Sequence, residues 1–110
     1  MSTTASCRVE IAPDHPAFDG HFPGQPLLPG VALLAEVLEA ASADPVLAAC
    51  IGARPVLEVA KFLAPVRPGT TLAIDFRVVP RSLAWTARAG EQVVASGQFG
   101  RADAASGEPR

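Results

Sequence analysis

The 110-residue chain contains no tyrosine, one tryptophan, one methionine and two cysteines. Its nine basic and eleven acidic residues leave a net charge of −2, which argues against nucleic-acid binding through a basic surface. Uninterrupted apolar runs are too short to span a bilayer. The stretch before Cys7 is short and polar, unlike a secretory signal. We therefore expect a cytoplasmic protein that binds neither nucleic acid nor membrane.

The scarcity of cysteine and histidine also limits metal chemistry. Cys7 and Cys50 form no Cys-x-x-Cys pair, and His15 and His21 have no nearby set of ligands of the usual kind. Two cysteines in a chain without an export signal are usually reduced. We expect free thiols, no metal and no organic cofactor.

Proline and glycine, in contrast, are plentiful, and they concentrate in the run HFPGQPLLPGV from His21 to Val31. Proline fixes φ and cannot donate a hydrogen bond, so this run is stiff and extended. Gly30 opens an apolar helical pattern, which places its N–H among the unpaired donors of a helix N-terminus. A carbonyl oxygen that acquires negative charge would be stabilised there. The run therefore predicts a site for chemistry on a polarised carbonyl, with His21 held beside it.

The rest of the sequence predicts one strand, a long helix, a short helical turn and four further strands. The long helix is apolar nearly all round, as in a buried helix, and Asp44-Pro45 ends it. Short connections between the later strands predict antiparallel neighbours. The expected elements are strand 7–11, helix 30–43, turn 46–51 ended by Gly52, and strands 55–63, 71–79, 82–89 and 92–99. We expect one domain over residues 1–100 and a disordered tail over 101–110.

The His21–Val31 run resembles the active-site signature of the FabZ/FabA-like 3-hydroxyacyl-acyl-carrier-protein dehydratases. Segments 11–20 and 60–69 are similar to that family's flanking landmarks, so the resemblance spans roughly residues 7–99. It implies an α+β hot-dog fold, in which an antiparallel sheet wraps around one central helix, and a homodimer with active sites at its interface. It also implies dehydration of 3-hydroxyacyl thioesters to trans-2-enoyl thioesters in fatty-acid or related acyl-chain synthesis. The partner would be acyl carrier protein or a coenzyme A thioester.

Dehydration of a 3-hydroxyacyl thioester needs a base for the α proton, an electrophile at the carbonyl and an acid for the departing hydroxyl. The ordinary pKa of imidazole suits His21 as the base. The Gly30 N–H suits the carbonyl, and the resemblance assigns both positions these same roles. Phe22, Pro29 and Val31 are expected to line the substrate site.

The acid is where this sequence departs from the family. In the dehydratases a Glu or Asp stands fourteen residues after the histidine and reaches the histidine of the other subunit, but that position is Ala35 here. Glu36 is rotated by about 100° from Ala35, whereas Glu39 returns to within about 40° but lies about 6 Å further along the axis. Three interpretations stay open: a bulge brings Glu36 into place, Glu39 acts directly or through water, or dehydration is impaired. We favour Glu36 or Glu39 as a retained acid.

Two other functions remain open at this point. One is a hot-dog acyl thioesterase; the other is a non-catalytic acyl-carrier-binding subunit, partnered with a complete homologue, which fits the missing acid. An acidic carrier would dock on a locally basic surface, for which Arg54, Lys61, Arg67 and Arg81 are the candidates. His15, which precedes Pro16, is interpreted as a partly exposed loop residue without a catalytic role.

Overall fold

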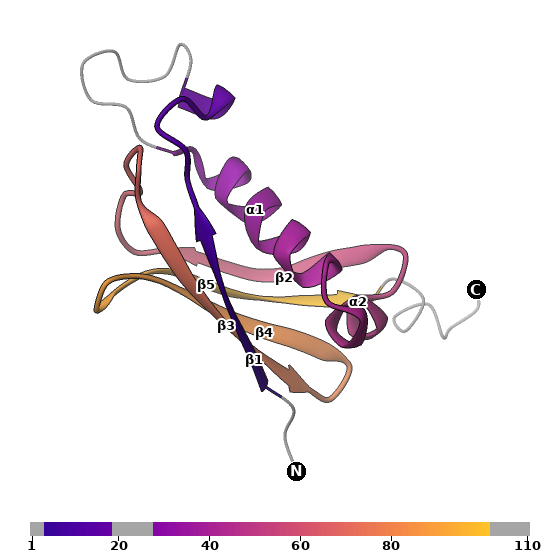
Figure 1. The fold of residues 1–110 in the computed structure, drawn as a ribbon. Coiled ribbons are helices and arrows are strands. Elements are labelled where there is room, and N and C mark those ends of the chain that lie inside the picture. Colours follow the sequence, from indigo (N-terminus) through magenta and orange to yellow (C-terminus); the bar gives the residue numbers. More distant parts are fainter. Residues whose placement is uncertain (1–3, 19–27, 102–110) are drawn as a thin grey trace.

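An antiparallel sheet with one long helix lying across it forms the α+β structure seen in Figure 1. The computed structural model describes residues 4–18 and 28–101, so His21, Phe22 and the tail from residue 102 lie outside the described residues. The elements in chain order are β1 (Thr4–Glu10), the 3-10 turn η1 (Pro16–Phe18), α1 (Gly30–Ser42), α2 (Pro45–Ile51), β2 (Pro55–Phe62), β3 (Thr71–Val79), β4 (Ser82–Ala89) and β5 (Gln92–Arg101). None of the helices in the described residues is long and apolar enough to cross a membrane.

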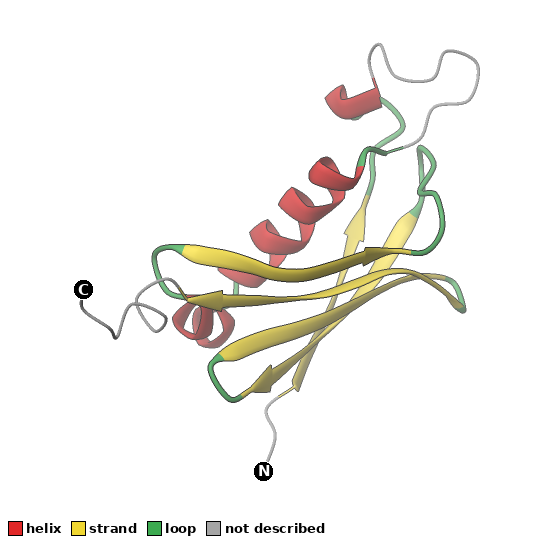
Figure 2. Ribbon diagram, turned by 180° about the vertical axis from the view of Figure 1, so that it is seen from behind, coloured by secondary structure: helices red, strands yellow, loops and turns green. Residues whose placement is uncertain are grey.

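The strand order is β1-β3-β4-β5-β2. The antiparallel pairing of β3 with β4 and of β4 with β5 confirms the prediction from their short connections. The predicted pairing of β2 with β3 is wrong, because β2 pairs with β5 and β1 occupies the free side of β3. The connection between β2 and β3 contains Pro65 and Pro68, which favour an extended path over a tight hairpin. Figure 2 shows this crossover leaving β2 as an edge strand.

The helical segments begin and end close to where the sequence predicts. Asp44 caps α2, because its carboxylate accepts hydrogen bonds from the N–H groups of Val46 and Leu47 at 2.9 and 3.2 Å. Gly52, with φ of 70°, ends the same helix as expected. The last strand runs two residues beyond the prediction, so Arg101 pairs with Pro55 instead of starting the tail.

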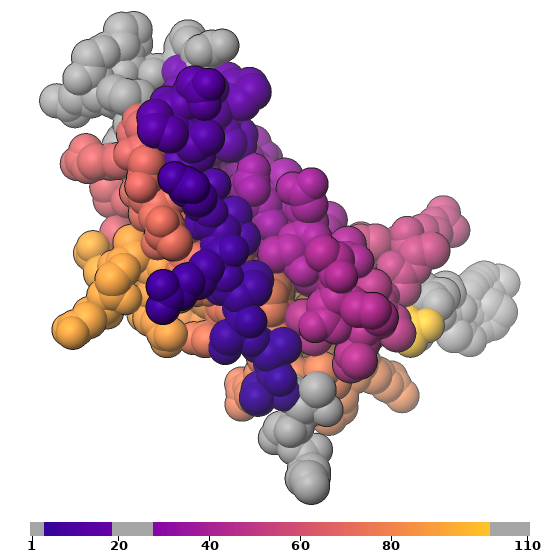
Figure 3. All heavy atoms as spheres, viewed as in Figure 1, coloured from indigo at the N-terminus to yellow at the C-terminus, as the bar shows by residue number. Residues whose placement is uncertain are grey.

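The core lies between α1 and the inner face of the sheet. Leu33, Val37 and Ala41 form one buried stripe along α1, and they share the core with Ile74, Phe76, Leu83, Trp85 and Phe99. The prediction of a helix buried all round is wrong for a single chain: Val31 is 76% exposed, and Figure 3 shows α1 at the surface beside β1. One sheet can cover only one side of a helix, so the remaining apolar side is free for another molecule.

The edge strand β2 is also unusually apolar. Five large hydrophobic side chains on it and just after it are between 40% and 60% exposed: Val56, Leu57, Val59, Phe62 and Leu63. A bulge interrupts the strand at Glu58, whose carboxylate accepts hydrogen bonds from Ser82 at 2.8 Å and Gln98 at 3.1 Å. Exposed edges normally carry charges that discourage pairing with other chains. The composition of this edge instead favours association.

Candidate active site

An apolar hollow of about 500 Å³ lies at the N-terminus of α1. One wall comes from the start of the helix, through Leu28–Gly30 and Leu33. The other wall comes from the end of β2 and the connection after it, over residues 62–66. The backbone also ties these walls together, since the Leu28 N–H donates to the Val66 carbonyl at 2.8 Å. The hollow therefore joins the two sequence landmarks that the chain separates by some thirty residues.

The start of α1 presents hydrogen-bond donors to this hollow. Ala32 and Leu33 both donate their N–H groups to the Pro29 carbonyl at 3.0 Å. Pro29 itself supplies no side-chain cap. The N–H groups of Gly30 and Val31 lie before the first residues that find an acceptor within the helix, and the helix dipole adds partial positive charge. An anionic or strongly polarised carbonyl oxygen fits this position.

Gly30 and Phe62 meet at the floor of the hollow. A Cβ added to Gly30 would lie 3.0 Å from Cζ of the Phe62 ring, closer than ordinary van der Waals contact. The absence of a side chain at Gly30 therefore lets the ring approach the helix start, and a larger residue would displace the ring. No pattern in the sequence predicts a role for Phe62 beyond its place in the 60–69 landmark.

The expected substrate-lining residues separate into two places. Pro29 and Gly30 line the hollow, but Val31 does not. Val31 faces a second apolar groove of about 240 Å³ together with Ala35, between α1 and β2. The reason is the helical period, since consecutive residues point about 100° apart. Phe22 and His21 lie outside the described residues, so their roles stay predictions.

The two candidate acids share one side of α1. Glu36 and Glu39 both line a groove of about 310 Å³ between α1 and residues 7–9 of β1. Ala35 lies on the other side of the helix, toward β2. At 1.5 Å per residue, Glu36 is about 9 Å from Gly30 along the axis, and Glu39 is further. Within one chain, the hollow at Gly30 contains neither carboxylate among its lining residues.

His15 holds Glu36. Its Nε2 lies 2.8 Å from Oε2 of Glu36, and the two side chains are only 21% and 22% exposed. The Ala17 N–H donates to Nδ1 of the same ring at 3.0 Å. Because Nδ1 is an acceptor, the ring proton is on Nε2 and is donated to the carboxylate. His15 is a partly exposed loop residue, as predicted, but its link to Glu36 was not expected, because the pairing depends on a contact between residues 21 positions apart.

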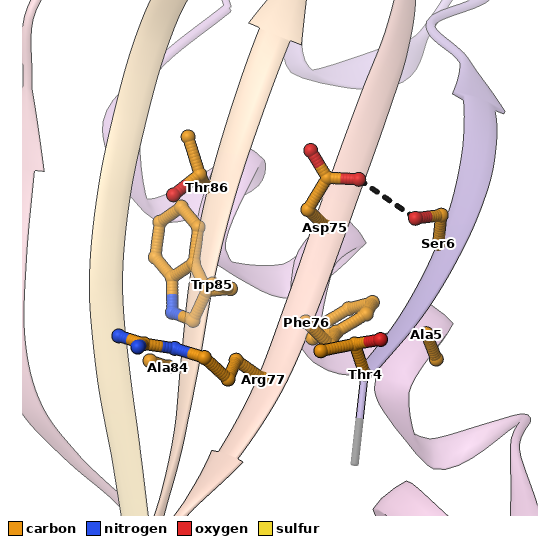
Figure 4. A pocket seen from close by; sticks show the side chains of 9 residues that line it. All are labelled: Thr4, Ala5, Ser6, Asp75, Phe76, Arg77, Ala84, Trp85 and Thr86. Atoms are coloured by element: carbon orange, nitrogen blue, oxygen red, sulfur yellow. Dashed lines mark hydrogen bonds between the residues drawn. The ribbon is translucent and has the colours of Figure 1, made fainter. Parts of the chain in front are cut away.

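A fourth hollow, of about 430 Å³, lies on the sheet where β1, β3 and β4 run side by side (Figure 4). Asp75 is its carboxylate. It accepts a hydrogen bond from Ser6 at 2.7 Å and forms an ion pair with Arg88 at 2.7 Å. Among the described residues, no histidine or cysteine lines this hollow. We therefore place the candidate site at Gly30 and not here.

The four basic residues predicted to dock an acidic carrier divide between the two ends of the sheet. Lys61 and Arg67, both exposed, adjoin the residues of β2 and its connection that line the Gly30 hollow. Arg54 and Arg81 are exposed at the other end, where Val56 and Ser82 both pair with Gly100. Only the first pair lies on the side of the candidate site.

Comparisons with known proteins identify the family of the chain. The model of the ApeI-like family, described as ApeI dehydratase, matches residues 1–98. The 3-hydroxyacyl-[acyl-carrier-protein] dehydratase FabZ of Anaeromyxobacter sp. (strain K) is 32% identical over 105 residues, which cover 81% of this chain and 65% of that protein. FabZ of Chlamydia trachomatis serovar L2 is 35% identical over 114 residues, covering 89% of this chain and 70% of that protein. The chain thus spans about two thirds of the length of these relatives.

Solved structures confirm the hot-dog fold. The dehydratase heterocomplex ApeI:P from Xenorhabdus doucetiae includes a chain with a TM-score of 0.74 and 29% identity, covering 88% of this chain and 85% of that one. The fluoroacetyl-CoA thioesterase FlK has a TM-score of 0.60 at 15% identity, covering 90% and 83%. At that identity, the likeness to the thioesterase concerns the fold alone.

Proposed function

The chain belongs to the ApeI-like dehydratase family, and we propose that it converts 3-hydroxyacyl thioesters to trans-2-enoyl thioesters, with the acyl group carried on acyl carrier protein or coenzyme A. The observation that carries this proposal is the start of α1, which has no side-chain cap from Pro29 and adjoins an apolar hollow at Gly30. Donors in an apolar surrounding are what a thioester enolate needs, because they stabilise charge that develops on its oxygen.

In the proposed mechanism the thioester carbonyl oxygen accepts a hydrogen bond from the Gly30 N–H. This polarisation acidifies the α carbon, and His21 accepts the α proton as general base. The hydroxyl on the β carbon then departs as water, for which a proton must be supplied. Pro29 and Phe62 line the hollow in which the reacting end of the acyl group would lie.

The role of Glu36 or Glu39 as the acid stays a prediction. Both lie on the β1 side of α1, whereas Ala35, the position that carries the acid in the resembling family, lies toward β2. A carboxylate that acts across a subunit interface at β2 would come from the Ala35 side. A second subunit that carries an acid at that position is therefore the alternative source of the proton.

We propose a homodimer in which two copies associate through β2 and the uncovered side of α1. Support comes from the apolar, half-exposed side chains of β2 and from Val31, which is 76% exposed. The similar ApeI chain comes from a heterocomplex, and this favours a second candidate: pairing with a different hot-dog subunit that completes the acid. In that case this chain contributes acyl-carrier binding, and its partner contributes the turnover. We place the protein in the cytoplasm.

The test is to incubate the purified chain with 3-hydroxyacyl groups of several lengths on acyl carrier protein and on coenzyme A, and to follow products by mass spectrometry. Loss of one water from the acyl group supports the proposal. Release of free carrier thiol without loss of water would indicate a thioesterase instead. Binding of the carrier without turnover would support the partnered, non-catalytic subunit.

A further inference from the structure

The hydrogen bond between His15 and Glu36 joins two elements that the dehydration mechanism does not otherwise connect. His15 stands in the turn that follows β1, and Glu36 stands in the middle of α1. The heavy atoms are 2.8 Å apart in a half-buried setting, where a hydrogen bond to a charged group is stronger than in open solvent. The pair therefore fastens the turn to the helix.

All the polar groups of His15 have partners within this turn or on α1. Its backbone N–H donates to Ala12 and its carbonyl accepts from Phe18, both at 3.0 Å. Its ring accepts from the Ala17 N–H and donates to Glu36. The ring also meets the buried Phe18 edge-on, with centroids 6.1 Å apart. Together these contacts fix both the backbone and the ring of His15 in one position.

The position of this turn in the chain gives it a role in the site. Phe18 is buried in the core, and His21 follows it by three residues. We propose that His15 and Glu36 form a positioning pair, which fixes the start of the segment that carries the catalytic base. This inference rests on the proposed dehydration. Glu36 then acts by accepting a hydrogen bond, and it does not protonate the leaving hydroxyl.

Glu36→Gln distinguishes a positioning role of Glu36 from a role as general acid. The glutamine carbonyl still accepts a hydrogen bond from Nε2 of His15, but the side chain has no acidic proton to give. A positioning role predicts that kcat of Glu36→Gln stays within about threefold of the wild type, whereas a general acid predicts a loss of about 10²-fold. Glu36→Ala and His15→Ala remove the link, and each should lower kcat about tenfold, because small displacements of a catalytic group are costly. The double alanine variant should fall no further than either single variant.

The isotope effect distinguishes a displaced base from a partly unfolded sample. With substrate deuterated at the α carbon, displacement of His21 slows proton abstraction and should raise the primary isotope effect on kcat in both alanine variants. A smaller active fraction would lower kcat and leave the isotope effect unchanged. Asp14→Ala is the matched control, since Asp14 is an exposed acid in the same turn. It should change neither quantity.

Hydrogen exchange tests the pair without any turnover. Backbone amides of residues 12–18 should exchange at least about fivefold faster in His15→Ala and Glu36→Ala, and at the wild-type rate in Glu36→Gln and Asp14→Ala. Unchanged exchange in the alanine variants would overturn the proposal, as would a Glu36→Gln variant as inactive as Glu36→Ala. If the wild type turns over no thioester, the proposed function fails, and the exchange rates alone decide whether the pair fixes this turn.

Discussion

The ring of Phe62 rests on the backbone of Gly30, where a Cβ would come within 3.0 Å of Cζ. Gly30 starts the central helix and Phe62 ends the edge strand β2, so one contact joins the proline-rich run to the second landmark of the sequence. It also sets the width of the hollow at the donors of the helix terminus. The contact is therefore a direct point at which to perturb the site.

Gly30→Ala should lower kcat/KM about tenfold, because the methyl group displaces the Phe62 ring into the space where a thioester would approach the Gly30 N–H. Phe62 is 49% exposed, so its ring can turn away at little cost. The better helix propensity of alanine offsets the remaining strain, and we expect the free energy of unfolding to change by less than about 1 kcal/mol. Steady-state kinetics and thermal unfolding measure the two effects. Adding Phe62→Leu should recover part of the activity; a Gly30→Ala variant with full activity contradicts the assignment.

Substitutions on α1 locate the acid. If the site lacks its acid on the Ala35 side, Ala35→Glu should raise dehydration by about tenfold or more, and Glu36→Gln and Glu39→Gln should change it little. Initial rates at saturating substrate, with folding checked by circular dichroism, provide the measurement. The reverse pattern, a loss of about 10²-fold in one of the glutamine variants, would show that this glutamate is the acid after all.

Leu57→Lys should abolish the homodimer, since it places a charge on the apolar edge where two copies of β2 would meet. Sedimentation velocity at micromolar concentration should show a dimer for the wild type and a monomer for the variant. Glu10→Lys is the control, because it adds the same side chain to an exposed site on β1, at the opposite edge of the sheet. A wild type that sediments only as a monomer rules out the homodimer and leaves the mixed complex to be tested with its partner.

Charge reversal tests the docking of an acidic carrier. Lys61→Glu and Arg67→Glu should raise KM for a carrier-linked substrate about tenfold, and should have less effect when the same acyl group is on coenzyme A. Arg54→Glu and Arg81→Glu, at the other end of the sheet, serve as matched controls. Equal effects from all four substitutions would point to net charge and not to a docking surface.

Cys7 should react with an alkylating reagent more slowly in the folded protein than in the unfolded chain. Burial raises the pKa of the Cys7 thiol, and the nearby carboxylates of Asp44 and Asp75 raise it further. Only the thiolate reacts, so the fraction available at pH 8 is reduced by folding. Iodoacetamide labelling followed by peptide mass spectrometry measures this. Labelling of Cys7 at the same rate with and without denaturant contradicts the expectation.

The elements, and the place of Gly30 at the start of α1, are predictable from the sequence because they depend on local signals. Proline before Gly30 sets the start of α1, and Asp44-Pro45 separates the two helices. The turns after residues 79 and 89 fix the pairing of β3, β4 and β5. Each of these features involves residues that are neighbours in the chain.

Long-range contacts account for what the sequence did not predict. β2 pairs with β5, which is distant in sequence, and the turn residues next to β2 do not specify which strand it joins. The link between His15 and Glu36 spans 21 residues and follows no motif. The all-apolar pattern of α1 predicts a buried helix although one side of it is exposed, because such a pattern does not show which apolar side chains the same chain covers.

The most direct measurement of the central claim is the rate at which wild type and His21→Ala convert a 3-hydroxyacyl thioester to its enoyl product. If His21 is the base, the variant should retain the fold and its oligomeric state but lose about 10²-fold or more in kcat. The loss should appear in the reverse hydration as well, because the same group returns the proton. A wild type that is active while His21→Ala turns over at the same rate would contradict the account.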